Sequence, residues 1–310
     1  GIFLSNGNTL RLSNISHKFK KLGFKVGHLD EEGAITFDYK HHIFRFDLNI
    51  FEKIDFYFAV GEREKSAIIS NNLKGNPEKK IYITGNNRFD ILDKKFFNLY
   101  EKDLKNIKKK YGKFVLITTK FNKINIPKKD DDVDYIKGLI KSGYMRREVD
   151  RYYGIESVKN DTKTMNELES FLTDLSTNFP DTKFLLKPHP GEDFNYWIKF
   201  KQKIKMSNLE IIPVNEFQTN AFIIASEFII ASNCTTLLES FLLNKIGINF
   251  LPYDNPKVHY ELTKALSINC YSKNELIKKI KNLLTKDNNY KKNLSDDENK
   301  ILSFTINNVK

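Results

Sequence analysis

The sequence predicts an α/β protein with mainly parallel sheets. Short runs rich in β-branched and aromatic residues alternate with longer helical patterns along the whole chain. Parallel strands need crossover connections, and a helix between two strands supplies one. The 310 residues, of which 40% are hydrophobic, are enough for two domains of ordinary size.

The first half of the chain reads as about half of a doubly wound domain. We expect strands over 1–7, 24–33, 54–61 and 80–86, with helices around Phe19 and over 64–72. A lysine-rich helix over 89–111 leads to Gly112, a residue type that often ends helices. We place the domain boundary there, which gives domains 1–112 and 113–310. Because the chain begins at Gly1 inside an apolar run, we expect the N-terminal domain to be incomplete.

The second half repeats the alternation of strands and helices. Strands are expected over 113–120, 182–188, 209–213, 227–232 and 246–252, and helices over 164–178, 194–205, 218–226 and 235–244. Residues 120–161 are polar and lack a clear period, which predicts a long loop with at most one helix that could cover a cleft. The last forty residues read as helical. The second domain is therefore expected to be a repeatedly wound βα unit.

Charge and cysteine content narrow the function classes. The net charge of +12 comes largely from lysines on expected helix faces, where a solvated surface is the simplest explanation. We expect no nucleic-acid partner, and peripheral contact with an anionic membrane is the better use of this charge. The two cysteines, Cys234 and Cys270, predict neither a disulfide scaffold nor a metal site. We therefore expect a cytoplasmic protein that contacts the inner face of the cell membrane.

The segment 229–240, "IIASNCTTLLES", joins an apolar strand to an apolar helix through small polar residues. Ligands of open α/β sheets bind beyond the carboxyl ends of strands, where helix N-termini offer free N–H groups to phosphates. We expect Ser232 to end the strand, Asn233 to lie in the turn and Thr235 or Thr236 to cap a helix whose first amides point at the ligand, and we assign all four residues to donor binding. Glu239, one turn into the helix, is placed to accept from a ribose. The structural alternative is a capping box between Thr236 and Glu239.

A second motif, "LLKPHPGED", places a histidine between two prolines after a strand. The prolines fix the backbone and remove two amide donors, which suits a side chain held in one orientation. His189 could bind a phosphate or assist a leaving group, and Lys187, which ends the strand at the same place, is assigned with it to donor binding. A purely structural histidine is the alternative.

Two motifs in the first half add charged groups. In "YITGNNRFDIL", Arg88 is expected to bind an anion, unless it only pairs with Asp90. In "HLDEEG", one of Asp30, Glu31 and Glu32 could be the general base for an acceptor hydroxyl, while the others are solvated or capping.

Other patterns do not predict a site. The run "DDDVD" at 130–134 lies in a charged loop, and the histidine pair 41–42 lacks metal-ligand spacing. The chain has neither a Walker loop nor a Gly-x-Gly-x-x-Gly fingerprint. We therefore expect no metal and no cofactor, and favour neither an NTPase nor a nicotinamide enzyme.

Together, "LDEEG", "TGNNRFD", "KPHPGE" and "SNCTTLLESFL" resemble, in order and spacing, the pattern of bacterial surface carbohydrate biosynthesis proteins. These proteins are similar to the GT-B glycosyltransferases. The resemblance implies two Rossmann-like domains that face each other across a cleft. The segment from Gly85 to Asp90 is also similar to the Gly-x-Pro-Arg-x-Asp segment of CDP-glycerol glycerophosphotransferases, with Asn87 in place of the proline.

The paired histidine and Ser/Thr motifs also resemble those of transferases that use CMP-linked sialic acid or Kdo. This resemblance implies that the histidine and the hydroxyls hold the phosphate of the donor. It further implies that Glu239 binds the ribose and that an acidic residue among 30–32 deprotonates the acceptor. The residues that would hold the phosphate are His189, Ser232, Thr235 and Thr236.

The leading hypothesis is therefore a metal-independent glycosyltransferase of bacterial surface polysaccharide biosynthesis. It would move a sugar from a nucleotide-sugar donor, for which CMP-linked sugars are a candidate, to a glycan or lipid-linked acceptor. One alternative is a polyol-phosphate transferase that uses CDP-glycerol or CDP-ribitol. Another is a non-catalytic glycan- or nucleotide-binding protein of an assembly complex. Fold alone does not decide among them.

Overall fold

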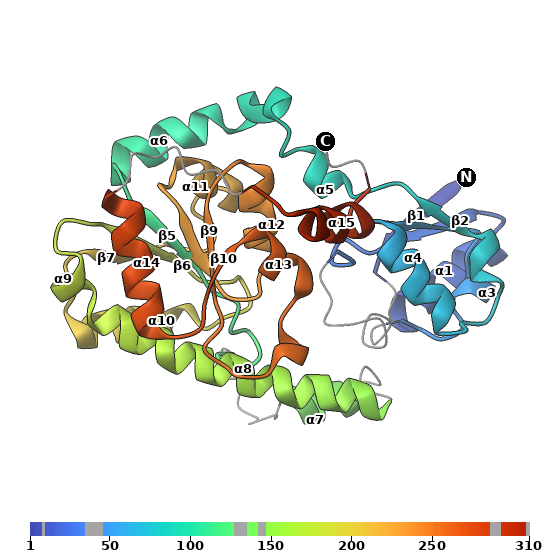
Figure 1. Ribbon diagram of the computed structural model, residues 1–310. Helices are drawn as coiled ribbons and strands as arrows, with labels where there is room; N and C mark the ends of the chain where they lie inside the picture. The colour runs from blue at the N-terminus through green and yellow to red at the C-terminus, as the bar shows by residue number, and fades with distance from the viewer. Residues whose placement is uncertain (8–9, 35–45, 127–134, 142–146, 286–292, 308–310) are drawn as a thin grey trace.

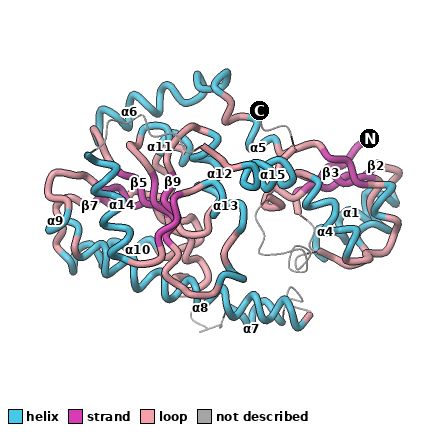
Figure 2. Tube along the Cα trace, viewed as in Figure 1, coloured by secondary structure: helices cyan, strands magenta, loops and turns pink. Residues whose placement is uncertain are grey.

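The computed structural model describes residues 1–7, 10–34, 46–126, 135–141, 147–285 and 293–307. Its strands form two separate parallel sheets, one in each half of the molecule (Figure 2). Helices pack on the sheets and connect their strands (Figure 1). The predicted α/β class with parallel sheets is therefore confirmed.

The first sheet has the order β1-β2-β3-β4. Its strands are β1 Ile2–Asn6, β2 Lys25–Leu29, β3 Phe56–Ala59 and β4 Ile81–Ile83. The helices α1 Leu10–Lys21, α3 Ile50–Lys53 and α4 Glu62–Ser70 share one core with a single face of this sheet. Side chains that alternate along the strands, such as Val26 and Tyr57, supply the sheet's part of that core.

The second sheet has the order β10-β9-β8-β5-β6-β7. Its strands are β5 Val115–Thr118, β6 Phe184–Lys187, β7 Leu209–Ile211, β8 Ile229–Ala231, β9 Gly247–Phe250 and β10 Ile268–Cys270. From β5 the chain winds outward through β6 and β7, and from β8 it winds the other way. The order of winding therefore reverses between β5 and β8, and such a switch point is where open α/β sheets bind ligands.

Both faces of the second sheet are covered. On one face lie α8 Glu148–Thr173, α10 Phe194–Ile204 and α14 Lys273–Thr285, and on the other α6 Glu101–Tyr111, α11 Thr219–Ala225, α12 Thr235–Leu242 and α13 Glu261–Leu266. Neighbouring strand residues enter opposite cores, as Leu185 and Leu186 do. The strands are apolar along their length because each of their faces is buried.

Packing crosses the expected domain boundary near residue 112 in both directions. Helix α6 precedes the boundary but packs on α11 of the second domain, where the rings of Tyr111 and Phe222 are 6.0 Å apart. The last described helix, α15 Asp296–Thr305, returns to the first domain and contacts α4. Just beyond it, the Asn307 amide donates to the Val60 carbonyl (2.9 Å). In Figure 1, α15 lies between the two sheets.

The loop expected over 120–161 is largely helical where the structure describes it. It contains α7 Tyr135–Lys141 and the first half of α8. The buried side of α8 carries polar residues such as Ser157, Asn160 and Asp161, so the hydrophobic period that would reveal the helix is missing. The hydrophobic pattern did not predict this helix, because its polar groups are buried rather than solvated.

Short elements complete the chain. They are α5 Asn87–Asp90, α9 Leu175–Asn178 and the 3₁₀ helices η1 Pro77–Lys79, η2 Lys94–Tyr100 and η3 Pro256–Val258. The long helix expected over 89–111 is thus divided, and the Asp93 side chain starts a new turn by accepting from the Lys95 amide (3.1 Å). In the part of the chain that the structure describes, no helix is long and apolar enough to cross a membrane.

Candidate functional site

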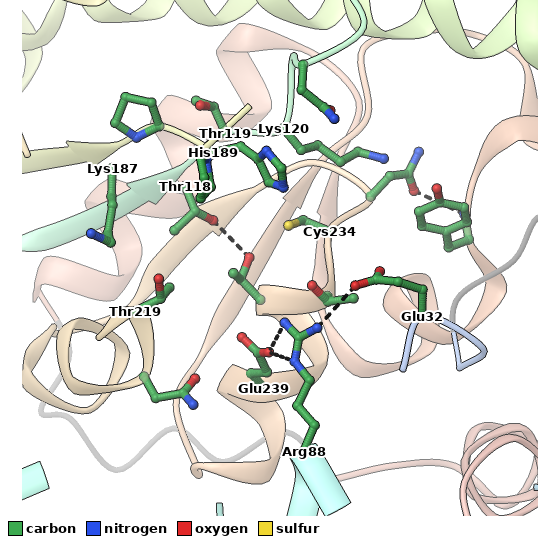
Figure 3. Close-up of a pocket in the computed structure, with 18 of the residues that line it drawn as sticks. Glu32, Arg88, Thr118, Thr119, Lys120, Lys187, His189, Thr219, Cys234 and Glu239 are labelled. Carbon is green, nitrogen blue, oxygen red and sulfur yellow. Dashed lines mark hydrogen bonds and ion pairs between the residues drawn. The ribbon is translucent and has the colours of Figure 1, made fainter. Parts of the chain in front are cut away.

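A cavity of about 630 Å³ lies between the two domains at the switch point. It lies at the carboxyl ends of β5, β6 and β8, and Glu32 and Arg88 of the first domain line its other side (Figure 3). Its lining residues are Glu32, Arg88, Thr118, Thr119, Lys120, Asn122, Lys123, Lys187, Pro188, His189, Pro190, Thr219, Asn220, Asn233, Cys234, Thr235, Thr236, Glu239 and Tyr260. All four sequence motifs therefore have members in one pocket, and "HLDEEG" contributes Glu32.

The loop after β6 presents the ring of His189 to this pocket. The Gly191 amide donates to Nδ1 of the ring (3.0 Å), so Nδ1 is an acceptor and the neutral ring carries its proton on Nε2. Desolvation lowers the pKa of His189, Lys120 lowers it further, and Glu192 and Glu32 oppose the shift. At neutral pH the ring therefore offers one N–H donor to the pocket rather than a positive charge.

The helix α12 begins at the pocket wall. Its N-cap residue is Cys234, whose side chain makes no capping hydrogen bond, and Thr235 and Thr236 form the first turn. The amides of these first residues have no acceptor within the helix and lie at its positive end. The Thr236 hydroxyl is paired with the Thr118 hydroxyl (2.8 Å), whereas Thr235 is only partly buried in the pocket lining. The capping box expected as an alternative for Thr236 and Glu239 is not formed, because Thr236 is already inside the helix.

Ser232 and Asn233, also assigned to donor binding, stand differently at the pocket, and their assignment stays a prediction. Ser232 is buried and does not line the pocket. Asn233 adopts a left-handed backbone conformation (φ 45°). In its buried side chain, Nδ2 donates to the Val258 carbonyl and Oδ1 accepts from the Tyr260 amide, each at 3.0 Å. These contacts fix the turn between β8 and α12. Asn233 therefore fixes the turn and also lines the pocket, together with Thr235 and Thr236.

Arg88 connects the two domains across the pocket. Its Nε and Nη2 donate to Oε1 of Glu239 at 3.0 and 2.7 Å, and its Nη1 lies 3.2 Å from Oε1 of Glu32. Burial works against the charge of Arg88, but Glu239 and Glu32 together raise its pKa. Burial likewise raises the pKa of Glu239, and Arg88 opposes that shift. The pairing of Arg88 with Asp90, the alternative to anion binding, is not the one observed, because the guanidinium stands between the carboxylates of Glu239 and Glu32 (Figure 3).

Of the three adjacent acids, only Glu32 lines the pocket. Asp30 is buried, and its Oδ1 accepts from the Glu32 amide (3.0 Å) within the turn after β2. Glu31 contributes backbone groups to the turn, because its amide donates to the Asn6 side chain and its carbonyl accepts from the Asn86 side chain. The turn therefore directs one of the three carboxylates, that of Glu32, to the pocket, and the expectation that one of the three acts as a base stays a prediction.

Lys187 borders the pocket, but its ammonium group is engaged elsewhere. Nζ donates to the carbonyls of Pro213, Val214 and Glu216 at 3.0–3.3 Å and lies 5.2 Å from the centre of the Phe222 ring. Burial lowers the pKa of Lys187 to about 8, with Glu216 opposing the shift. In Figure 3, Lys187 lies on the opposite side of the view from Glu32. These bonds hold the loop after β7, and because Lys187 also lines the pocket its assignment to donor binding stays a prediction.

The sequence interpretation missed the polar residues after β5. Thr118 and Thr119 are buried at the end of that strand, and Lys120 is partly buried, with Nζ 4.6 Å from the centre of the Tyr260 ring. The signal was present, because "KFVLITTK" also runs from an apolar strand into polar residues at the same edge of the sheet. Lys120 adds a cation to the wall that carries His189 and α12.

No group of three or more His, Cys, Asp and Glu side chains within the described ranges is placed to hold a metal ion. The two runs discounted above, 41–42 and 130–134, lie outside those ranges. Cys234 and Cys270 are both buried and free of a disulfide.

No family model matches the sequence, and no curated protein matches it. Solved structures with the same fold include the UDP-GlcNAc 2-epimerase of Methanocaldococcus jannaschii in complex with UDP-GlcNAc and UDP (17% identity, 98% of this chain and 75% of that chain, TM-score 0.56). The enzyme of Neisseria meningitidis bound to UDP-GlcNAc is similar (17%, 91% and 68%, 0.57), as is that of Rickettsia bellii (15%, 97% and 70%, 0.56). The expected GT-B-like fold of two Rossmann-like domains is thereby confirmed.

Proposed function

We propose that this protein is a GT-B-type glycosyltransferase of bacterial surface polysaccharide biosynthesis that uses a nucleotide-activated sugar. One observation carries the proposal. The free amides of α12, the Nε2 donor of His189 and the Lys120 cation border a single cavity, and a carboxylate, Glu32, faces them from the other domain. Donors on one wall suit an anionic leaving group, and a carboxylate on the other suits a base for the acceptor.

In this proposal the phosphate of the donor lies at the N-terminus of α12. The amides of Thr235 and Thr236 and the Thr235 hydroxyl would donate to its oxygens, with His189 and Lys120 completing the set. The negative charge that develops on the leaving nucleotide would be stabilised by these fixed donors. Both Arg88 bonds to Glu239 end on Oε1, which leaves Oε2 for a ribose hydroxyl.

Glu32 would accept the proton of the acceptor hydroxyl. It is the only member of the acidic run that lines the cavity, and Arg88 holds it toward the second domain. The acceptor, a glycan or a lipid-linked glycan, would enter between Glu32 and the sugar of the donor. The proposal requires neither a metal nor a cofactor, because the donor phosphate is met by amides, His189 and Lys120.

The solved structures support the nucleotide-sugar part of the proposal through the ligands in their names, UDP and UDP-GlcNAc. They are named as epimerases, so glycosyl transfer rests on the motifs and on the cavity. The resemblance to CDP-glycerol and CMP-sugar transferases rests on the motifs alone and supports cytidine nucleotides as first candidates.

The decisive experiment has two stages. Thermal shifts with CMP, CDP, UDP, GDP and ADP identify the nucleotide, because a ligand of the native state raises its apparent stability. Corresponding activated sugars are then incubated with acceptors and the products are analysed. Glycosyl transfer releases the nucleotide and forms a glycosidic bond. A new phosphodiester identifies a polyol-phosphate transferase, an unreleased nucleotide-sugar with one inverted carbon identifies an epimerase, and binding without turnover identifies a non-catalytic protein.

The matched control for this experiment compares two histidine variants, one in the pocket and one outside it. His189→Ala should lower turnover of the donor by about 100-fold or more if the ring stabilises the leaving group, in line with the loss of one such donor elsewhere. His17→Ala, on the exposed side of α1, should leave turnover unchanged. Equal turnover in both variants contradicts a role for His189.

Peripheral membrane contact is a separate part of the proposal. Helix α6 carries five exposed lysines, 102, 105, 108, 109 and 110, which would meet anionic headgroups. Flotation with vesicles that contain phosphatidylserine tests it, and binding should fall as salt rises. Equal recovery with vesicles of phosphatidylcholine alone contradicts it.

A further inference from the structure

Glu192 is a buried carboxylate of the motif "LLKPHPGED" to which the sequence interpretation gave no role. It is 3% exposed and is the fifth residue after the end of β6. It forms no ion pair within the described ranges, so hydrogen-bond donors must compensate its charge. Such a group is costly to bury, and the arrangement of its donors shows what it does.

The donors to Glu192 come from two pocket loops. Oε1 accepts from the Thr119 hydroxyl (2.7 Å), the Phe121 amide (2.9 Å) and the His189 amide (3.2 Å). Oε2 accepts from Nε1 of Trp197 (2.8 Å), which is fully buried on α10. Asn125 adds a longer bond to Oε2 (3.5 Å). One carboxylate thus joins the loop after β5 to the loop after β6 and fixes both to the core.

The loop after β6 also forms hydrogen bonds within itself around His189. The Glu192 amide donates to the His189 carbonyl (2.9 Å), and the Gly191 amide donates to Nδ1 of the ring (3.0 Å). The backbone amide of His189 is held by Glu192. The direction of the ring therefore depends on where Glu192 sits.

We propose that Glu192 is a positioning residue that holds His189 and the Thr119–Phe121 loop in the pocket and acts on the ring through its charge. This deepens the proposed function, but its test needs no substrate. The groups that face the ring are Glu192 and Glu32, which favour its protonated form, and Lys120, which disfavours it. Removing the charge of Glu192 therefore removes one of the two charges that oppose the effect of Lys120 on the pKa of His189.

The test compares E192Q, which keeps the size of the side chain, with E192D, which keeps its charge but shortens its reach. The control is E169Q on α8, where the carboxylate accepts from the Tyr196 hydroxyl. NMR titration gives the pKa of His189, and hydrogen exchange gives the protection of the Phe121 and His189 amides. Both are measured on the full chain without ligand.

For E192Q we expect the pKa of His189 to fall by about half a unit or more, which is the effect of one charge at this range even in a high dielectric. For E192D we expect both amides to exchange about tenfold faster while amides of β8 stay protected. E169Q should change neither. A pKa at or above the wild-type value in E192Q, or unchanged exchange in E192D, overturns the proposal. If E192Q does not fold, the exchange result of E192D decides.

These outcomes are distinct from failure of the proposed function. A protein that binds no nucleotide but shows the expected titration and exchange keeps Glu192 as the positioning residue of a site with another ligand. A protein that transfers sugar without these changes keeps its function and loses this role for Glu192.

Discussion

The two walls of the cavity are held in place by different means. On the wall of the second domain, buried side chains of that same domain fix the loops: Glu192 fixes the His189 loop and Asn233 fixes the turn before α12. On the wall of the first domain, the side chain of Glu32 is 54% exposed and its ion-pair partner is Arg88. The remaining bonds of Arg88 go across the cavity to Glu239.

This difference has a functional consequence. The wall that would receive the donor phosphate is formed within one domain, so its geometry does not depend on the other domain. The wall that carries Glu32 takes its position through an ion pair across the cavity. Changes to the second-domain wall should therefore alter ligand affinity, and changes to the first-domain wall should alter the coupling between the domains.

Breaking the bridge across the cavity should have the largest effect. Arg88→Met leaves the buried carboxylate of Glu239 without its cation, and an uncompensated buried charge is costly. Because Arg88 is about one-third exposed, we expect a loss of roughly 2–3 kcal/mol in the free energy of unfolding, below the range for fully buried pairs. Urea titration measures it.

The double variant R88M/E239Q is the control for this prediction. It removes both charges and should recover part of the lost stability, whereas Lys95→Met, at an exposed pair, should change little. If the double variant is no more stable than R88M, the uncompensated charge of Glu239 is not the cause of the stability that R88M loses.

Acid should weaken the first domain by a somewhat smaller amount. His28 in β2 is fully buried, its Nε2 lies 2.5 Å from the Ser16 hydroxyl, and burial lowers its pKa to about 4. Because the folded pKa is depressed below the ordinary 6.5, the unfolded state takes up the proton first. The stability is full above that ordinary value and is lost as pH falls toward 4. Between pH 7 and pH 5 the loss should be about 2 kcal/mol.

The comparison that isolates this effect uses His28→Gln and the exposed His17→Gln. Urea titrations at both pH values should show that H28Q loses less stability on acidification than the wild type, while H17Q follows the wild type. The same acid loss in H28Q and wild type would assign the effect to other groups.

The two threonines of α12 should separate affinity from stability. Thr235→Val should weaken nucleotide binding about tenfold or more, because a hydrogen bond to a charged phosphate is worth roughly 1.5–3 kcal/mol. Thr236→Val should instead lower the free energy of unfolding by about 1 kcal/mol, because it leaves the buried Thr118 hydroxyl unpaired. Calorimetry with the nucleotide from the thermal-shift panel, and urea titration, measure the two quantities. If T235V binds as tightly as the wild type, its hydroxyl is not a phosphate ligand.

The smallest effect is expected for Lys187→Met. The ammonium of Lys187 is held by backbone carbonyls of the loop after β7, so nucleotide affinity should stay within about twofold of the wild type. The same calorimetric assay checks this value. A tenfold loss of affinity in a variant that remains folded would support the assignment of Lys187 to donor binding.

The local pattern of the sequence determined the fold class and the edge of the sheet where the site lies. Apolar strands such as 182–188 and 227–232 run into polar residues, and parallel strands bring such ends to one edge. This was enough to place His189, Thr235 and Thr236 at the site, because strand ends and helix starts follow from neighbouring residues. It did not reveal α8, whose buried polar residues hide the helical period.

Only the tertiary structure decided which polar side chains face the cavity. Glu32 enters it while Asp30 remains buried in the turn, and the ammonium of Lys187 turns to the carbonyls of another loop. Arg88 pairs with Glu239, 151 residues away along the chain, and not with the nearby Asp90. Contacts of this kind join segments that are far apart in the sequence, and spacing within one segment carries no information about them. The direction of a side chain at a strand end is therefore set by its partners across the fold.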